Sequence, residues 1–236
     1  MVQRLDKIIS NSGMLSRKDT AKIIRKGAVA INDKIVTEPS FKVDPHTDKI
    51  TVNNKPFTYK QHYHIMLNKP QGYITATEDF KDKTVLDLIG DEIPKKRLCP
   101  AGRLDKDTEG FVFLTTDGNL AHKVTGPKNH VEKKYYVEID ESMEKDFIEA
   151  FKKGVVLDDG TLSKSAILEI ISEKSGYLTI TEGKFHQVKR MFNCVSRNVT
   201  FLKRISIGQV TLDSSLNPGE YRELTYDEVE KICLKK

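Results

Sequence analysis

The chain has 236 residues, of which 38% are hydrophobic and 31% are charged, a balance typical of a soluble globular protein with one large domain or two modest ones. No apolar run approaches the roughly 18 residues that span a membrane, and the start MVQRLDKIIS lacks the apolar core and cleavage pattern of a secretory signal, so we expect a cytoplasmic protein. Cys99, Cys194 and Cys233 are odd in number and form no C-x-x-C pair, which disfavours a disulfide framework and a thiolate metal site.

The positive charge is concentrated at the N-terminus. Residues 1–60 contain 12 Lys or Arg against 6 Asp or Glu, whereas the remaining residues contain 27 against 28. The net charge of +5 is therefore carried by the first quarter of the chain. This part is predicted to contact a polyanion, although a solvated basic surface would have the same composition.

The N-terminal residues predict a short helix and, further along, a hairpin and a strand. The apolar residues of the helix are spaced for one face: Leu5, Ile8 and Ile9. The N-S-G sequence at 11–13 ends this helix. Residues 28–44 have the pattern of a hairpin with a short polar turn, and residues 48–57 predict one more strand.

A second short helix is predicted between these elements. Ser16, with Asp19 three residues later, forms a capping arrangement, and Gly27 closes the helix. Ile23 and Ile24 can face inward, which leaves the basic residues of the helix largely in solvent. These basic residues are Arg17, Lys18, Lys22, Arg25 and Lys26.

The segment RLDKIISNSGMLSRKDTAKIIRKGAVAINDKIV, residues 4–36, resembles the S4 RNA-binding domain. The resemblance covers about the first 55 residues and implies a domain over 1–58, with a linker at 54–62. Because that family holds structured RNA against two helices, the resemblance also implies a set of phosphate contacts. The residues so implied are Arg4, Arg17, Lys18, Lys22 and Arg25.

From residue 62 onward, strand patterns alternate with helical ones. Segments rich in β-branched and aromatic residues predict strands at 135–140, 165–171, 177–181 and 200–212. Helical spacing occurs at 143–154 and at 225–236, and the latter opens with a Thr225/Glu228 capping box. We therefore predict an α+β protein, with a small N-terminal α/β domain followed by a mixed, mostly antiparallel sheet and flanking helices.

The sequence AGRLDKDTEG, residues 101–110, places ionisable side chains directly before the apolar stretch FVFLTT. Asp105, Asp107, Glu109 and Gly110 match positions 1, 3, 5 and 6 of a calcium-binding EF-hand loop. Position 12 of that loop requires a bidentate glutamate, but here it is Thr116. A glycosidase-like pair of carboxylates is a second interpretation, and nothing in the sequence sets their separation.

A third interpretation rests on a resemblance to the pseudouridine synthases. The segment 101–118, AGRLDKDTEGFVFLTTDG, resembles their catalytic motif, and MLNKPQGYITAT, EKKYYVEI and EGKFHQVKRMF resemble three further motifs in order and spacing. The segment 205–225 resembles the closing strand and turn of the branch that acts on small-subunit ribosomal RNA. The resemblance implies a catalytic domain over 59–236 that isomerises a uridine of 16S ribosomal RNA, uridine 516, to pseudouridine.

The resemblance places Asp105 at the position of the catalytic aspartate, which the family uses to attack the sugar or base or to assist removal of the 2′ proton. A buried cation would keep such a carboxylate ionised. Lys189 takes the place of the arginine that pairs with the aspartate in related branches, and Arg190 remains an alternative partner. Both could instead bind phosphate. Apolar residues near them fall on one helical stripe that we expect in the core: Phe185, Val188, Met191, Phe192 and Val195.

Tyr135 is implied to be the family tyrosine, because Lys133 precedes it by two residues in a K-x-Y motif. It would stack on the extruded base, although Tyr136 leaves the register uncertain by one residue. Alternation along a strand allows only one of these two tyrosines to face the site. Arg103 and Lys106 flank Asp105 and would hold the RNA backbone, with simple solvation as the alternative for Lys106.

No cofactor is implied, because the isomerisation needs neither redox chemistry nor an energy source, and the chain contains no G-x-G-x-x-G or P-loop motif. His62 and His64 have no third ligand at metal-binding spacing, so we expect no metal. The expected partner is ribosomal RNA or a small-subunit assembly intermediate, and the expected state is a monomer. The alternative is a non-catalytic RNA-binding or ribosome-assembly factor that has kept the fold.

Overall fold

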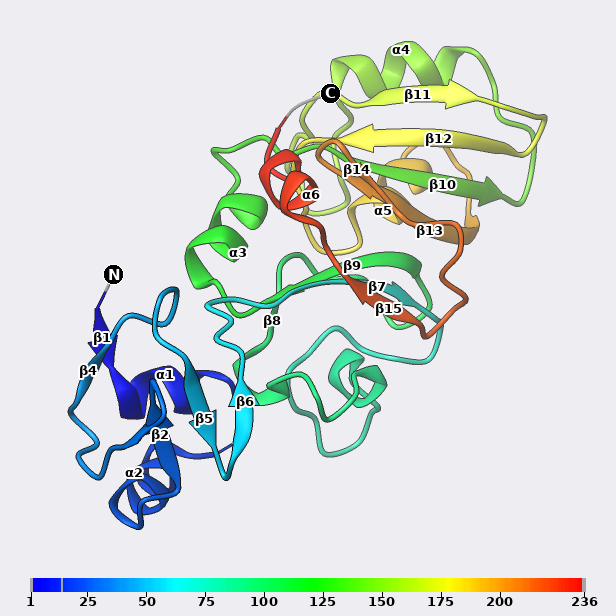
Figure 1. The fold of residues 1–236 in the computed structure, drawn as a ribbon. Coiled ribbons are helices and arrows are strands. Elements are labelled where there is room, and N and C mark those ends of the chain that lie inside the picture. The colour runs from blue at the N-terminus through cyan, green and yellow to red at the C-terminus, as the bar shows by residue number, and fades with distance from the viewer. Residues whose placement is uncertain (1, 14, 235–236) are drawn as a thin grey trace. The chain divides into compact units, whose positions relative to one another are not determined.

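The structure is a computed structural model that describes residues 2–13 and 15–234, and the chain divides into two compact units (Figure 1). The first unit runs to Tyr63 and includes Gly90–Leu98, and the second comprises His64–Ile89 and the chain from Cys99 onward. The domain boundary predicted after residue 58 lies five residues before Tyr63, where the N-terminal segment of the first unit ends. Chain order alone gave no sign that the segment 90–98 would join the N-terminal unit.

Among its described residues, the first unit contains two α-helices, one short 3-10 helix and two small sheets. The helices are α1 (Leu5–Asn11) and α2 (Arg17–Arg25), followed late in the unit by the short 3-10 helix η2 (Lys95–Arg97). The larger sheet has the order β3 (Lys34–Ile35), β2 (Val29–Ile31), β5 (Ile50–Val52), β6 (Lys55–Phe57). The smaller pairs β1 (Gln3–Arg4) with β4 (Lys42–Val43). Both predicted helices are confirmed, and Ser16 caps α2 by accepting a hydrogen bond from the Asp19 amide at 3.1 Å.

The linker predicted at 54–62 is wrong in its first part, because residues 55–57 form β6 and pair with β5. Asn53 and Asn54 both have positive φ angles, of 50° and 61°, as a two-residue hairpin turn requires. Asn32 and Asp33 adopt the same conformation between β2 and β3. The asparagine pair therefore folds the chain back onto the sheet instead of releasing it as a linker.

In the part of the chain that the structure describes, the second unit is built on one sheet of nine strands. Its main order is β11-β12-β10-β13-β9-β7-β15, with β14 beside β13 and β8 beside β9. Every pair is antiparallel except β13 with β9, which confirms the predicted mixed, mostly antiparallel sheet. The strands are β7 (His64–Lys69), β8 (Cys99–Pro100), β9 (Glu109–Thr115), β10 (Lys133–Ile139), β11 (Ile167–Ile170), β12 (Ser175–Ile180), β13 (Val199–Ile207), β14 (Val210–Thr211) and β15 (Tyr221–Glu223).

Helices flank this sheet. They are the short 3-10 helix η1 (Val85–Leu88), α3 (Gly118–Thr125), α4 (Asp146–Lys153), α5 (Gln187–Asn193) and α6 (Tyr226–Lys231). α4 runs along β11 at one end of the sheet (Figure 1). The Thr225/Glu228 capping box of α6 is present, but this helix is shorter than predicted, and the last two residues of the predicted span lie outside the described residues.

The apolar stretch after residue 110 forms most of the buried interior strand β9. Phe111, Val112, Phe113 and Leu114 are all 0% exposed, because neighbouring strands flank β9 and both faces of the sheet are covered there. The ionisable residues 103–109 therefore lie where a loop enters the core. Among the described residues, no helix has the length and apolar character needed to cross a membrane.

Gly110 lies where this loop becomes β9, opposite Arg204 in the parallel pair β9–β13. Its φ angle is +99°, and a Cβ atom at this position would collide with the backbone oxygen and nitrogen of Arg204. We predict that Gly110→Ala lowers the free energy of unfolding by about 3 kcal/mol, through backbone strain and steric overlap together.

Gly160→Ala is the matched control, because Gly160 has a φ angle of +79° but open space around its Cα. This control should lose only about 1 kcal/mol, the cost of the backbone conformation. Urea denaturation of both variants measures the difference. Equal losses would show that close contact between β9 and β13 is not what requires glycine at residue 110.

Candidate active site

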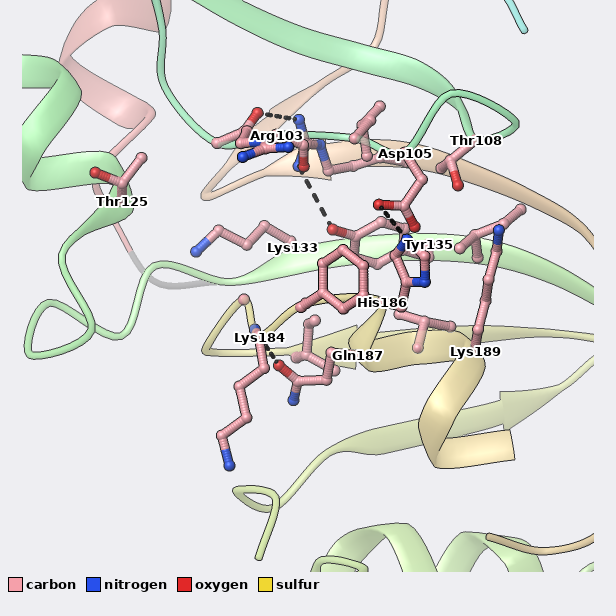
Figure 2. Close-up of a pocket in the computed structure, with 18 of the residues that line it drawn as sticks. Arg103, Asp105, Thr108, Thr125, Lys133, Tyr135, Lys184, His186, Gln187 and Lys189 are labelled. Atoms are coloured by element: carbon pink, nitrogen blue, oxygen red, sulfur yellow. Dashed lines mark hydrogen bonds and ion pairs between the residues drawn. The ribbon is translucent and has the colours of Figure 1, made fainter. Parts of the chain in front are cut away.

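A pocket of about 510 Å³ opens in the second unit between the loop before β9, strand β10 and the segment leading into α5 (Figure 2). Its volume lies in the range of small-ligand sites. One carboxylate lines it, that of Asp105. Five side chains that carry positive charge also line it: Arg103, Lys133, Lys184, Lys189 and Arg204. This imbalance makes the pocket suited to an anionic ligand.

Lys69, at the end of β7, holds the loop that carries Asp105. The side chain is 0% exposed, and its ammonium donates hydrogen bonds to the backbone carbonyls of Asp105 at 2.9 Å, Thr108 at 2.7 Å and Lys106 at 3.3 Å, and also to that of Pro70. Burial lowers the pKa of Lys69 to about 8, whereas nearby carboxylates, that of Asp107 foremost, act in the opposite direction. The ammonium therefore fixes the loop through its main chain and leaves the Asp105 side chain available.

Arg204, on β13, holds the same loop from the other side. Its guanidinium is buried and donates to the carbonyls of Phe111 at 2.7 Å, Gly102 at 3.0 Å and Arg103 at 3.3 Å. A longer contact of 3.5 Å joins Nη1 to the hydroxyl of Tyr135. Among the described residues no carboxylate pairs with this guanidinium, so its charge acts on the pocket.

The loop is further closed by threonine contacts. The Thr75 hydroxyl accepts from the amide of Leu104 at 3.0 Å and donates to the carbonyl of the same residue at 2.8 Å. The Thr108 amide donates to the Asp105 carbonyl at 3.1 Å, which completes a tight turn. Within the described residues the Thr108 hydroxyl is buried without a hydrogen-bond partner, and Thr108 lines the pocket. A buried unpaired hydroxyl is unusual and is available to a bound ligand.

The Asp105 side chain is 27% exposed and lies beside His186, with 3.5 Å between Oδ1 and the histidine Nε2 (Figure 2). His186 precedes α5 in a left-handed conformation with a φ angle of 48°. Its ring stacks on that of Phe185, with 3.8 Å between ring centroids and 18° between planes. The strained backbone thus turns the imidazole toward the carboxylate.

The two pairings expected for Asp105 are absent from the structure. The Lys189 ammonium contacts both carboxylate oxygens of Asp107, at 2.6 and 2.7 Å, and holds the pKa of that carboxyl below its usual range. Arg190 instead pairs with Asp158 and Asp159. The expected partners are wrong because closer carboxylates compete for each cation, although Lys189 still lines the pocket.

The two neighbouring tyrosines of β10 face opposite sides of the sheet. Tyr135 is 7% exposed and lines the pocket near Asp105 (Figure 2). Tyr136 donates from its hydroxyl to Glu138 at 2.8 Å and contacts the rings of Tyr177 and Phe201. The geometry therefore leaves Tyr135 as the tyrosine that a ligand in the pocket can meet.

The apolar stripe predicted around α5 is correct in its middle and wrong at its start. Val188, Met191 and Phe192 are buried, as expected of a core face. Phe185 precedes the helix and is 72% exposed, so it belongs to the pocket lining and not to the core. The helix begins only at Gln187, after the left-handed residue 186, which removes Phe185 from the helical spacing.

Of the two predicted RNA contacts that flank Asp105, Arg103 lines the pocket. The Lys106 ammonium pairs with Asp82 at 2.7 Å, and its side chain is 53% exposed. An exposed pair of this kind contributes little to stability, so it does not prevent Lys106 from meeting a phosphate. The RNA-binding role of both residues stays a prediction.

The basic residues predicted to bind RNA in the first unit lie on or beside its two helices. Arg4 donates to both carboxylate oxygens of the buried Asp6, at 3.0 and 2.9 Å, and Arg17 approaches the same carboxylate at 3.4 Å. Hydrogen bonds from Arg4, above all, lower the pKa of Asp6. Asp6 thus fixes two guanidinium groups side by side at the surface. The other predicted contacts are exposed: Lys18, Lys22, which pairs with Asp19, and Arg25.

Lys69 and Arg204 were not recognised from the sequence as site residues. Lys69 is the last residue of β7 and is buried like the four residues before it. A lysine at the end of a largely apolar strand was the available signal. For Arg204 the sequence pattern is misleading. Phe201, Ile205 and Ile207 alternate along β13 and suggest that their face is the buried one, whereas Arg204 lies on the opposite face. Both faces of β13 meet other elements, so alternation cannot identify its buried residues.

The calcium interpretation of 105–116 lacks the required backbone. Residue Glu109 already belongs to β9, so the second half of the supposed loop is a strand. Among the described residues, no group of three or more His, Cys, Asp or Glu side chains could hold a metal ion.

Comparisons with known proteins relate this geometry to one family. The family model for RNA pseudouridylate synthase matches residues 62–194, and that for the S4 domain matches residues 3–50. An uncharacterised RNA pseudouridine synthase of Bacillus subtilis is 46% identical over 97% of this chain and 98% of its own. Ribosomal small subunit pseudouridine synthase A of Escherichia coli is 42% identical over 97% and 99%. A crystal structure of a pseudouridylate synthase, 40% identical, superposes with a TM-score of 0.70 and covers 98% of this chain and 99% of its own.

The contacts of Lys69 predict a large effect of its removal. Lys69→Met removes one hydrogen-bond donor from each of four backbone carbonyls and should lower the free energy of unfolding by about 3 kcal/mol. Lys152→Met is the control, because this side chain is 68% exposed and should change stability by less than about 0.5 kcal/mol. Chemical denaturation measures both, and similar values for the two variants would contradict an anchoring role for Lys69.

Proposed function

We propose that this chain, which belongs to the RNA pseudouridylate synthase family, isomerises one uridine of small-subunit ribosomal RNA to pseudouridine. Asp105 is proposed to be the residue that carries out the chemistry. The observation that carries this proposal is the Asp105 carboxylate in a positively lined pocket, on a loop whose backbone is held by two buried cations. The small-subunit substrate is supported by the near full-length similarity to ribosomal small subunit pseudouridine synthase A of Escherichia coli. The finer target, uridine 516 of 16S RNA, is part of the proposal and rests on the sequence resemblance alone.

The reaction breaks the bond between C1′ of the ribose and N1 of uracil, turns the detached base and joins its C5 to C1′. The proton that leaves C5 is balanced by the proton that N1 gains, so no oxidant, reductant or energy source is consumed. One carboxylate is sufficient for this chemistry. Asp105 acts either as a nucleophile toward the sugar or the base, or as a base toward the 2′ proton.

The surroundings of Asp105 suit each of these roles. An aspartate reacts only when it is ionised, oriented and shielded from bulk water. The Lys69 and Arg204 contacts orient the loop, and the Asp105 side chain is 27% exposed within a positively lined pocket. The target uridine must leave its stack to reach this pocket, as base-modifying enzymes require.

Tyr135 is proposed to hold the extruded base while it turns. The ring lies in the pocket near Asp105, and the contact from Arg204 limits movement of its hydroxyl (Figure 2). An aromatic face binds a base without fixing its rotation about the stacking axis. The stacked uracil can therefore exchange N1 for C5 without leaving the pocket.

The first unit is proposed to bind the ribosomal RNA around the target. Its S4 domain carries the excess positive charge of the chain, and Asp6 pre-orders the guanidinium groups of Arg4 and Arg17. Pre-ordered donors lose less conformational entropy when they bind phosphate. Affinity for RNA would thus come largely from the first unit and the chemistry from the second.

Replacement of the catalytic carboxylate tests the proposal directly. Asp105→Asn should fold and bind ribosomal RNA with unchanged affinity, yet form pseudouridine at least about 10³-fold more slowly, because the amide can neither attack nor accept a proton. The readout is chemical mapping of pseudouridine in 16S RNA after incubation with the purified protein.

Asp107→Asn is the matched control on the same loop. Its carboxylate is occupied by Lys189, so this variant should stay within about threefold of the wild-type rate, as expected for loss of a surface ion pair. Retained activity in Asp105→Asn would remove Asp105 from the mechanism. RNA binding without modification by the wild-type protein would favour the alternative, a non-catalytic ribosome-assembly factor.

The first unit generates a separate prediction on salt dependence. Arg17→Gln with Lys18→Gln should weaken RNA binding and reduce the slope of log affinity against log salt by about 0.7 to 0.9 for each lost phosphate contact, because fewer counterions are released. Lys152→Gln with Lys153→Gln, on α4 of the second unit, removes equal charge and should leave the slope nearly unchanged. An unchanged slope in the first variant would refute the assignment.

A further inference from the structure

Lys133 is a buried charged residue that the proposed chemistry does not use. It is the first residue of β10 and lies on the same face as Tyr135, because side chains two positions apart on a strand point the same way. Lys133 is 7% exposed, yet it lines the pocket. The lysine therefore stands next to the tyrosine proposed to hold the base.

The ammonium of Lys133 has few partners. Among the described residues it donates one hydrogen bond, to the carbonyl of Val131 at 2.9 Å, and no carboxylate pairs with it. Burial, with a smaller contribution from nearby Arg204, lowers the pKa of Lys133 to about 8. A buried ammonium with unused donor capacity is costly unless an anion meets it.

The direction of the side chain separates it from the reacting centre. In Figure 2 the Lys133 side chain extends away from Asp105, toward Thr125, whereas Asp105 and His186 lie at the other end of the pocket. If the uracil stacks on Tyr135 and the ribose lies at Asp105, the RNA strand that continues from the uridine would pass the end of the pocket where Lys133 lies. The backbone of that chain carries a charged phosphate at every nucleotide.

We propose that the Lys133 ammonium binds the phosphate of a nucleotide directly adjacent to the target uridine, and so fixes where the extruded nucleotide enters the pocket. The proposal rests on the proposed function, because it takes the uridine to lie between Asp105 and Tyr135. A phosphate is favoured over a base carbonyl, because a full negative charge compensates a buried ammonium better than a dipole does. The net positive lining of the pocket supports the same ligand.

The test combines a protein substitution with a neutralised phosphate. Lys133→Met in the full chain is compared with Lys134→Met, whose side chain lies on the opposite face of β10 and pairs with Glu169 at 2.8 Å. The substrates are ribosomal RNA fragments that carry a single uncharged methylphosphonate, placed in turn on each phosphate near the target uridine. Pseudouridine formation gives kcat and KM for each combination, and RNA binding is measured in parallel.

Lys133→Met should raise KM by about tenfold or more with kcat changed by less than about threefold, as expected for loss of a charged hydrogen bond. One methylphosphonate next to the uridine should raise the KM of the wild-type protein and of Lys134→Met by a similar factor. The same methylphosphonate should not raise the KM of Lys133→Met any further. Lys133→Arg should recover part of the loss. If Lys133→Met fails to fold, Lys133→Gln takes its place in the same comparison.

Equal losses in all proteins at every methylphosphonate would overturn the proposal and leave Lys133 as a support for the Val131 carbonyl. A fall in kcat with unchanged KM would also overturn it, because it would place Lys133 at the reacting atoms. Failure of the proposed function has a different signature, since the wild-type protein would then form no pseudouridine on any fragment. The parallel binding measurements would still decide whether Lys133 and one phosphate interact.

Discussion

Two buried cations hold the loop of Asp105 by its backbone carbonyls, and the rest of the site depends on this arrangement. Lys69 reaches the loop from β7 and Arg204 reaches it from β13, the two strands that flank β9. Both cations donate their hydrogen bonds mainly to carbonyl groups, so neither forms an ion pair with the Asp105 carboxylate. Burial of two charges is unfavourable by itself, so the many carbonyl contacts are what make the arrangement stable.

The same arrangement answers why ionisable residues precede a fully buried strand. β9 is the interior strand that follows the loop and places it at the rim of the pocket, and the close approach of Gly110 to Arg204 sets where the loop ends. The pocket that results has a positive lining with one carboxylate in it. This lining is suited to a polyanion, and the proposed function takes the carboxylate to meet a flipped nucleotide there.

The sequence predicted the helices and strands better than the ion pairs. Alternation correctly separates Tyr135 from Tyr136, and capping residues correctly mark α2 and α6, because these are local properties. The partners of Lys189 and Arg190 could not be predicted, since Asp107 and Asp158 reach them only through the tertiary fold. Arg204 was missed because β13 is covered on both faces, and Phe185 was misplaced because the left-handed residue 186 delays the start of α5.

The central claim is that Asp105, in this setting, makes pseudouridine in small-subunit ribosomal RNA. The most direct measurement maps pseudouridine across 16S RNA from cells that lack the protein, and from the same cells supplied with the wild-type chain or with Asp105→Asn. The account predicts one uridine whose modification disappears without the protein and returns only with the wild-type chain. Modification that persists without the protein, or that returns with the asparagine variant, would contradict it.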